Sequence, residues 1–249
     1  MHEYGLLGVG EIAAAIVTGL CEGVEEPPTV LLSPRNRERA AALADRHPSV
    51  SVASDNQALV DGCAVLVLAI RPQDARTILG PLRFRPDQPV ISLLAGVSLA
   101  GLAELVAPAR DLARAIPLPP VARRAGFTPV HPGGAAARDL FGRLGEAAVV
   151  EDEDAFGAMS VASGTIAAHL RYLAAIGRWL SRQGVAPEQA SRYVASVFAG
   201  VTLGEGDDLA ELARSYATPG GINERFAAML DEAGTFDLVE RSLQAIRDG

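Results

Sequence analysis

Cysteine is scarce in this sequence, and the two residues present, Cys21 and Cys63, have neither CxxC spacing nor any other spacing of a zinc site. The sequence therefore does not encode a disulfide framework. No secretory signal is recognisable, and no apolar stretch reaches the length that spans a bilayer. We therefore expect a protein of the reducing cytoplasm, without a membrane partner.

Basic residues are fewer than acidic residues, 22 against 30, which gives a net charge of −8. This balance argues against nucleic acid or anionic membrane as a partner, although local clusters of arginine can still hold a small anion. The 49% hydrophobic and 21% charged residues are typical of globular proteins. With 249 residues, the chain is long enough for one large or two moderate domains.

Signatures of several catalytic and metal-binding classes are missing. The four histidines, His2, His47, His131 and His169, lack metal-ligand spacing, and there is no Ser-His-Asp order, P-loop or zinc motif. His169 falls on a mostly apolar helical segment, where a histidine is more often a satisfied core residue than a catalyst. We therefore predict no metal site.

A glycine-rich turn near the amino terminus is the most informative feature present. An apolar run ends in Gly8 and Gly10, and Ala13 then opens an apolar helical pattern. The first glycine permits a tight turn, the second lets a diphosphate approach the backbone, and the helix start offers free N–H groups to phosphate. The pattern predicts a dinucleotide site formed by Gly8, Val9, Gly10, Glu11 and Ile12. The alternative is a purely local strand-to-helix turn.

Glu11 does not suit such a site. A carboxylate at the mouth of the turn would repel a diphosphate unless it points away into solvent. Its other natural role is to cap the helix.

The segment after the second apolar run, residues 29–32, indicates which dinucleotide is bound. An NAD site usually carries an acid here for the ribose hydroxyls, but this chain has Ser33, Arg35, Asn36 and Arg37. Arginine suits a ribose 2′-phosphate, because its guanidinium gives charge-assisted bidentate hydrogen bonds. NADP(H) is therefore the predicted cofactor. The alternative is that these arginines are the solvated start of a helix that runs to about Arg46.

Strands and helices alternate up to about residue 150, which predicts an α/β fold with a doubly wound, Rossmann-type sheet. The continuous apolar runs 64–70 and 89–94 are typical of strands buried on both faces. Helices are expected around Leu59 and Val60, from Ala75 to about Leu82, and after Ser98, which can cap a helix. The remaining strands are expected at residues 50–53, 112–116 and 147–150.

From residue 152 onward only helical patterns remain, so we predict a domain boundary between a 1–151 cofactor domain and a 152–249 helical domain. One apolar stripe runs from Met159 to Leu180, and apolar residues also occur on its other sides. About 95 residues can build only a small core, so we expect a second subunit to cover this helix, giving a homodimer. The alternative is a monomer covered by the first domain.

Two later helices begin with clear signals. Pro187 fits the first position of a helix reaching about Leu203, and Asp208 with Glu211 resembles a capping pair. Between them and the carboxyl terminus, residues 218–224 (Thr-Pro-Gly-Gly-Ile-Asn-Glu) interrupt the helical sequence. Two glycines before a helix start offer free N–H groups that can hold an anion. The alternative is a simple turn between helices.

Six motifs occur in the order seen in pyrroline-5-carboxylate reductase, which the chain resembles over nearly its whole length. They are the glycine turn, the Ser-x-Arg-Asn-Arg of residues 33–37, and residues 68–73 (Leu-Ala-Ile-Arg-Pro-Gln), 92–98 (Ser-Leu-Leu-Ala-Gly-Val-Ser), 114–117 (Arg-Ala-Ile-Pro) and 218–221 (Thr-Pro-Gly-Gly). The resemblance implies a Rossmann NADP domain and a helical dimerisation domain. It also implies hydride transfer from NAD(P)H to a cyclic imine carbon, giving L-proline.

The resemblance further implies site residues. For the cofactor it adds Ala69, Ile70, Arg71, Pro72, Ala95 and Gly96 to the residues given above. For the substrate carboxylate it implies the Pro-Gly-Gly loop with Thr218, Gly220, Gly221 and Asn223, together with Ser163 and Gly164. Thr218 and Asn223 are the expected catalytic positions.

The chain departs from the family pattern at several of these positions. The family usually has Asn at Glu11, Lys at Arg71 and Thr at Asn223, and it has Met-Pro-Asn-Thr-Pro where residues 116–120 are Ile-Pro-Leu-Pro-Pro. An amide at Asn223 can donate a hydrogen bond but relays protons poorly. Three functions therefore stay open: reduction of pyrroline-5-carboxylate, reduction of another imine or ketimine, and non-catalytic NADP binding by a regulatory protein of the same fold.

Overall fold

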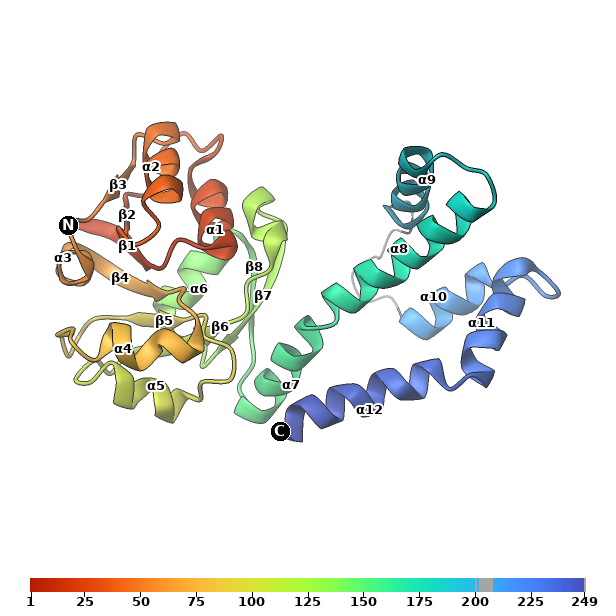
Figure 1. Cartoon of the computed structure of the whole chain (residues 1–249). Helices are drawn as coiled ribbons and strands as arrows, with labels where there is room; N and C mark the ends of the chain where they lie inside the picture. The colour runs from red at the N-terminus through yellow and green to blue at the C-terminus, as the bar shows by residue number, and fades with distance from the viewer. Residues whose placement is uncertain (200, 202–207, 249) are drawn as a thin grey trace. The chain divides into compact units, whose positions relative to one another are not determined.

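The structure is a computed structural model that describes residues 1–199, 201 and 208–248 (Figure 1). It divides into two compact units, Met1–Ser160 and Val161–Gly249. Helix α7 (Glu153–Ser163) begins in the first unit and ends in the second. The first turn of this helix packs with the sheet-bearing unit, because Phe156 is buried there.

The first unit is built on one sheet of eight strands in the order β3-β2-β1-β4-β5-β6-β7-β8. Strands β1 to β6 pair in parallel, β7 is antiparallel to β6, and β8 is parallel to β7. The predicted Rossmann-type fold is confirmed. The strands are β1 (His2–Leu7), β2 (Val30–Leu32), β3 (Val50–Val52), β4 (Cys63–Leu68), β5 (Val90–Ser92), β6 (Leu112–Ala115), β7 (Gly126–His131) and β8 (Gly145–Val149).

The sequence prediction placed no strand between residues 116 and 147, and this was wrong, because β7 lies there. Its pattern is broken by Pro129, which has no N–H to donate to a sheet and argues against an internal strand. In the structure Pro129 contributes through its carbonyl, which accepts a hydrogen bond from the N–H of Ile116 at 3.0 Å. The strand can therefore lie between β6 and β8 despite its proline.

Helices cover both faces of the sheet, as Figure 1 shows. Neighbouring residues of a strand point to opposite faces. Accordingly, Leu6 packs in a core with Ile16 and Phe141, whereas Leu7 packs in a second core with Leu59. Helices α1 (Glu11–Cys21), α2 (Arg37–Arg46) and α6 (Ala135–Gly142) cover the first face, and α3 (Asn56–Gly62), α4 (Ala75–Leu79) and α5 (Leu99–Leu105) the second; η1 (Pro72–Asp74) and η2 (Pro119–Arg123) are short 3₁₀ helices.

Side-chain caps fix where several of these helices begin. Asn36, Asp55 and Ser98 each accept a hydrogen bond from the N–H three residues later, at the starts of α2, α3 and α5. Helix α4 ends at Leu79, earlier than predicted.

The second unit contains only helices in the part that the structure describes, as predicted. Besides the end of α7 these are α8 (Ile166–Arg182), α9 (Pro187–Ala199), α10 (Leu209–Tyr216), α11 (Ile222–Glu232) and α12 (Thr235–Asp248). Asp208 caps α10 by accepting from the N–H groups of Ala210 and Glu211. Of the predicted extension of α9 to Leu203, only Val201 is described, and it is not helical; the other positions lie outside the described residues.

The single apolar stripe predicted from Met159 to Leu180 is divided between two helices. The break falls at Gly164 and Thr165, where the Thr165 hydroxyl donates to the carbonyl of Ala162 at 2.8 Å and its N–H donates there at 3.1 Å. Glycine and a threonine that bonds the preceding turn both weaken a continuous helix. The apolar stripe in the sequence does not show where this break falls.

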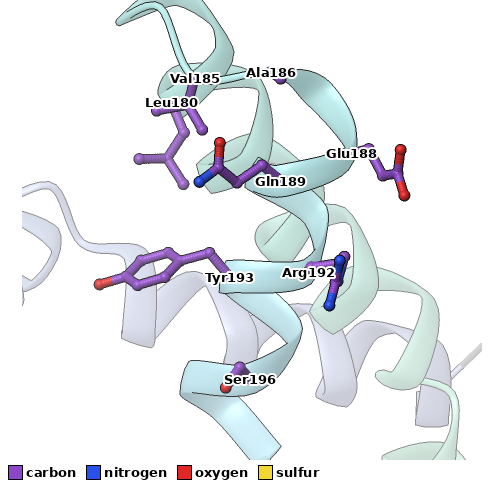
Figure 2. Close-up of a pocket in the computed structure, with 8 residues that line it drawn as sticks. All are labelled: Leu180, Val185, Ala186, Glu188, Gln189, Arg192, Tyr193 and Ser196. Atoms are coloured by element: carbon purple, nitrogen blue, oxygen red, sulfur yellow. The ribbon is translucent and has the colours of Figure 1, made fainter.

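The helical unit has almost no core of its own. Among its described residues only Ala190 and Val194 are buried hydrophobic residues. Large apolar side chains are exposed on every helix from α8 to α12, among them Leu170, Trp179, Tyr193, Leu209, Ile222, Phe226, Met229, Phe236 and Ile246. A groove between the end of α8 and α9 adds Leu180, Val185 and Ala186 to this surface (Figure 2). None of the helices described has the length and apolar character of a membrane span.

Candidate functional site

A groove lies at the carboxyl ends of β1 and β4, where the strand order reverses. In open α/β sheets this switch point is where ligands bind. The groove, of about 560 Å³, is lined by the loops after β1, β2 and β4. Its lining brings together nine residues that the sequence assigned to the cofactor, Gly8, Val9, Gly10, Arg35, Asn36, Arg37, Ala69, Ile70 and Arg71, and adds Glu38 and Asp74.

The two glycines of the turn have different surroundings. Gly8 has φ +103°, and a Cβ placed on it would lie 2.5 Å from the carbonyl oxygen of Ala69 on the loop after β4. Gly8 is therefore required by the fold itself. A Cβ on Gly10 would meet nothing within 4 Å, and no side chain caps α1. The start of α1 thus presents its N–H groups beside open space, as an anion site requires.

Two residues predicted to contact the cofactor, Ser33 and Asn36, form hydrogen bonds to the glycine turn. The buried Ser33 hydroxyl accepts a hydrogen bond from the N–H of Gly8 at 2.9 Å. The Asn36 amide donates to the carbonyl of Val9 at 3.1 Å. Both residues join the loop after β2 to the loop after β1, so their first effect is to fix the shape of the groove.

Three arginines line the groove, and one carboxylate links two of them. Asp74 accepts from Arg71 at 2.9 and 3.0 Å and lies 3.5 Å from Arg35. Arg37 has no ion-pair partner in the part of the chain that the structure describes. Arg37 is therefore the arginine of the groove whose charge is fully available to a ligand. The sequence analysis did not identify Asp74 as a partner of these arginines, although a spacing of three residues from Arg71 is usual for an ion pair.

Glu11 is paired with Arg39, the third residue of α2. Its side chain is 88% exposed, and neither residue lines the groove. Glu11 does not cap α1, because the cap position is Gly10 and no side chain bonds there.

The remaining predicted cofactor residues lie outside this groove. Pro72 and Gly96 line a neighbouring hollow between η1, α4 and α5. Ile12, Ser33 and Ala95 line neither hollow.

In the helical unit, the Pro-Gly-Gly loop borders a small hollow. It is lined by Thr218, Gly221 and Asn223, which the sequence assigned to the substrate, and by Tyr216 and Ile222. Ser163 and Gly164, at the turn between α7 and α8, do not line it.

Several donors of this loop are already engaged within the chain. The N–H of Gly220, a residue with φ +72°, donates to the carboxylate of Glu224 at 2.7 Å. The N–H of Gly221 donates to the carbonyl of Thr218 at 2.8 Å. The Asn223 amide donates to the carbonyl of Tyr216 at 3.0 Å. The predicted anion nest thus holds a carboxylate of its own helix, an arrangement close to a capping box, and the sequence reading missed it.

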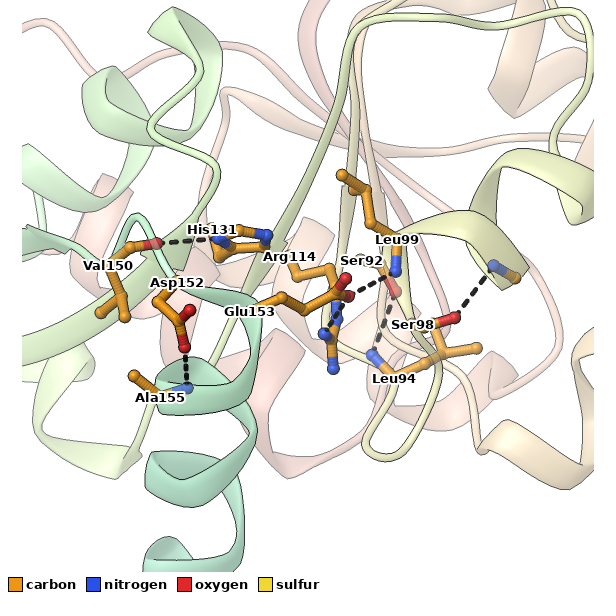
Figure 3. Close-up of polar contacts among 11 residues, drawn as sticks. Ser92, Leu94, Ser98, Leu99, Arg114, His131, Val150, Asp152, Glu153 and Ala155 are labelled. Atoms are coloured by element: carbon orange, nitrogen blue, oxygen red, sulfur yellow. Dashed lines mark hydrogen bonds and ion pairs between the residues drawn. The ribbon is translucent and has the colours of Figure 1, made fainter.

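A third polar cluster joins α7 to the sheet (Figure 3). Glu153, the first residue of α7, accepts from the guanidinium of Arg114 at 2.7 Å and from the N–H of Leu99 at 2.7 Å. The Leu99 N–H and the Arg114 charge hold the pKa of Glu153 below its ordinary value. Arg114 also lies 4.6 Å over the ring of Phe156, and His131 bonds the carbonyl of Val150. Within this cluster, the Glu153 carboxylate links the start of α7 to β6 and to the start of α5.

Burial raises the pKa of the Cys63 thiol to about 11, so this cysteine is protonated at neutral pH. Within the residues described, no group of three or more His, Cys, Asp or Glu side chains is arranged to hold a metal ion.

Comparison with known proteins gives one family model and several curated relatives. The family model described as NADP oxidoreductase, coenzyme F420-dependent, matches residues 3–96. Pyrroline-5-carboxylate reductase 2 of Bacillus subtilis is 26% identical over 237 residues, which cover 90% of this chain and 85% of the relative. Pyrroline-5-carboxylate reductase of Pseudomonas aeruginosa is 26% identical over 253 residues, 96% and 92% of the two chains.

Two solved structures align with nearly the whole chain. The 1-pyrroline-5-carboxylate reductase of Streptococcus pyogenes superposes with a TM-score of 0.78 at 25% identity, covering 99% of this chain and 97% of the other. The NADP-bound pyrroline carboxylate reductase of Plasmodium falciparum has a TM-score of 0.81 at 16% identity, with 99% and 96% coverage, and supports the fold. The resemblance predicted from the motifs is therefore confirmed: the chain is similar to pyrroline-5-carboxylate reductases over nearly its whole length, at about a quarter identical residues.

Proposed function

We propose that the protein is an NADPH-dependent reductase that transfers hydride to a cyclic imine carboxylate, 1-pyrroline-5-carboxylate, and forms L-proline. One observation carries the proposal. The groove combines an uncapped helix start beside Gly10 with arginines and no ribose-binding acid after β2, in a chain similar to pyrroline-5-carboxylate reductases over nearly its full length.

The residues of the groove fit NADPH. The open space at Gly10 and the N–H groups of α1 suit the diphosphate. Arg37 and Arg35 suit the ribose 2′-phosphate, since both guanidinium groups line the same groove. When bound, the cofactor supplies the hydride. The protein's part is to hold Gly8, Ser33 and Asn36 in the hydrogen-bonded frame that shapes the groove.

The Pro-Gly-Gly loop is the proposed substrate-binding element. Thr218, Gly221 and Asn223 surround one hollow, which suits a small organic acid. In this proposal Gly220 contributes its N–H, and Thr218 and Asn223 orient the imine. The resemblance adds Ser163 and Gly164. Because Asn223 is a poor proton relay, the imine must arrive protonated or receive its proton from water.

A second candidate substrate is an imine without a carboxylate. It is favoured by Glu224, whose carboxylate already accepts from the Gly220 N–H. A substrate carboxylate must displace that group, whereas a neutral or cationic imine need not.

Oxidation of NADPH by the purified protein, followed by its absorbance, tests these assignments. The substrates are pyrroline-5-carboxylate, 1-pyrroline and a panel of further cyclic imines, and nucleotide binding is measured separately by fluorescence titration. Turnover of pyrroline-5-carboxylate with formation of proline supports the first candidate. Turnover of 1-pyrroline alone supports the second. Tight NADPH binding without turnover of any imine contradicts both and favours a non-catalytic NADP-binding protein.

The proposed assembly is a homodimer formed through the helical unit. Among the described residues this unit buries only two of its hydrophobic residues and exposes large apolar side chains on five helices. Such a surface requires a cover, and a second copy supplies a matching apolar face by symmetry. Light scattering after gel filtration tests this. Leu170→Glu should shift the mass toward the monomer, whereas Phe127→Glu, at an equally exposed position of the first unit, should leave the dimer intact.

A further inference from the structure

The ion pair between Glu11 and Arg39 stands directly beside the proposed diphosphate site. Glu11 is the first residue of α1 and follows Gly10, whose free space and neighbouring N–H groups suit the diphosphate. A carboxylate here opposes the anion that the helix start attracts. The position therefore needs a group that cancels or turns away the charge of Glu11.

Arg39 is held in place to do this. Its own N–H donates to the side chain of Asn36 at 3.4 Å, which fixes the first turn of α2. The same Asn36 donates to the carbonyl of Val9, two residues before Glu11. The segments that follow β1 and β2 are thus joined at two points, Asn36 to Val9 and Arg39 to Glu11. These contacts place the Arg39 guanidinium against the Glu11 carboxylate.

Arg39 itself does not line the groove, unlike Arg35 and Arg37. Its effect on a bound nucleotide therefore passes through Glu11 rather than through direct contact. This effect concerns the diphosphate, which NADPH and NADH share, and not the 2′-phosphate, which only NADPH carries.

We propose that Arg39 is a positioning residue for the cofactor, which neutralises Glu11 and keeps its carboxylate away from the diphosphate. The inference rests on the proposed cofactor site. Loss of Arg39 leaves Glu11 unpaired, and a free carboxylate near the diphosphate weakens both nucleotides. Loss of Glu11 removes the need for Arg39.

A double-mutant cycle on the full chain tests the proposal, with dissociation constants for NADPH and NADH measured by fluorescence titration. Arg39→Met keeps the aliphatic stem and should weaken both nucleotides by a similar factor, roughly five- to tenfold at low salt. Glu11→Gln alone should bind both at least as tightly as the natural protein. The double variant should return to within about twofold of the natural protein, because the two residues are coupled. Arg37→Ala is the matched control and should weaken NADPH alone.

Two results would overturn the inference. If Arg39→Met weakened only NADPH, Arg39 would contact the 2′-phosphate directly. If Glu11→Gln did not rescue Arg39→Met while melting temperatures stayed equal, Arg39 would act independently of Glu11. Failure of the natural protein to bind either nucleotide would instead refute the proposed cofactor site, and this inference with it.

Discussion

The guanidinium of Arg114, in β6, lies 2.7 Å from the carboxylate of Glu153, the first residue of α7. Arg114 is almost fully buried, whereas 41% of the Glu153 side chain is exposed. Because Glu153 also accepts from the N–H of Leu99, one carboxylate joins β6, the start of α5 and the start of α7 (Figure 3). This contact holds the first residue of α7 against the sheet-bearing unit.

Glu153→Gln should therefore destabilise the protein in a pH-dependent way. The folded-state pKa of Glu153 is lowered, first by the Leu99 N–H and then by Arg114, so its contribution is present above the unfolded pKa and is lost as the pH falls through the folded pKa. Solvent screening at this half-exposed group limits the loss at pH 7 to about 1 kcal/mol. Thermal unfolding at pH 7 and at pH 4 and below should show the difference from the natural protein shrinking with acid.

Asp154→Asn is the control for this experiment. Asp154 is the next residue of the same helix turn and is exposed, so it shares the interaction with the helix start but not the contacts with Arg114 and Leu99. A loss of equal size in both variants would show that the helix dipole, and not the Arg114 contact, is responsible.

The two glycines of the turn should respond to alanine in opposite ways. Gly8→Ala places a Cβ 2.5 Å from the Ala69 carbonyl at a positive φ, and should cost about 2 kcal/mol or more of folding stability. Gly10→Ala meets no protein atom, so the melting temperature should stay nearly unchanged. Its methyl group would instead project into the proposed diphosphate space, and NADPH affinity should fall at least tenfold, a modest loss for a displaced phosphate contact. Unchanged affinity in a folded Gly10→Ala protein would contradict this placement of the diphosphate.

Replacing Arg35 and Arg37 together by Ala should weaken NADPH by about a hundredfold, because each loses a hydrogen bond to a charged group. NADH should change little, since it lacks the 2′-phosphate. The structure refines this expectation. Arg35 is shared with Asp74, whereas Arg37 has no ion-pair partner among the described residues, so Arg37→Ala should account for the larger part. Equal weakening of both nucleotides would contradict the 2′-phosphate assignment.

Local patterns of the sequence were sufficient to predict the strands other than β7 and several helix starts, because an apolar run such as residues 64–70 and a cap such as Ser98 act over a few residues. Strand β7 was not predicted, because Pro129 breaks the local pattern of a strand. The strand forms through its pairing with β6 and β8, which the local sequence does not reveal. For the groove, the residue types predicted which loops line it, those after β1, β2 and β4, but not the hydrogen-bond and ion-pair partners of each side chain. Ser33 bonds Gly8 across 25 residues and Glu11 pairs with Arg39 across 28, and such choices are made by tertiary structure.

Glu224 should set how well a carboxylate substrate binds. Its carboxylate holds the Gly220 N–H at 2.7 Å, so a substrate carboxylate directed to that N–H must first displace it and is repelled by its charge. Glu224→Gln removes the charge but keeps a side chain that can accept the same hydrogen bond. The KM for pyrroline-5-carboxylate should fall about three- to tenfold, the size of one screened charge interaction, while the KM for 1-pyrroline should stay constant. Glu232→Gln, an exposed position of the same helix, provides the control. Parallel changes of KM for both imines would mean that Glu224 acts on the loop as a whole. A rise of KM confined to pyrroline-5-carboxylate would mean that the Glu224 carboxylate helps to bind this substrate.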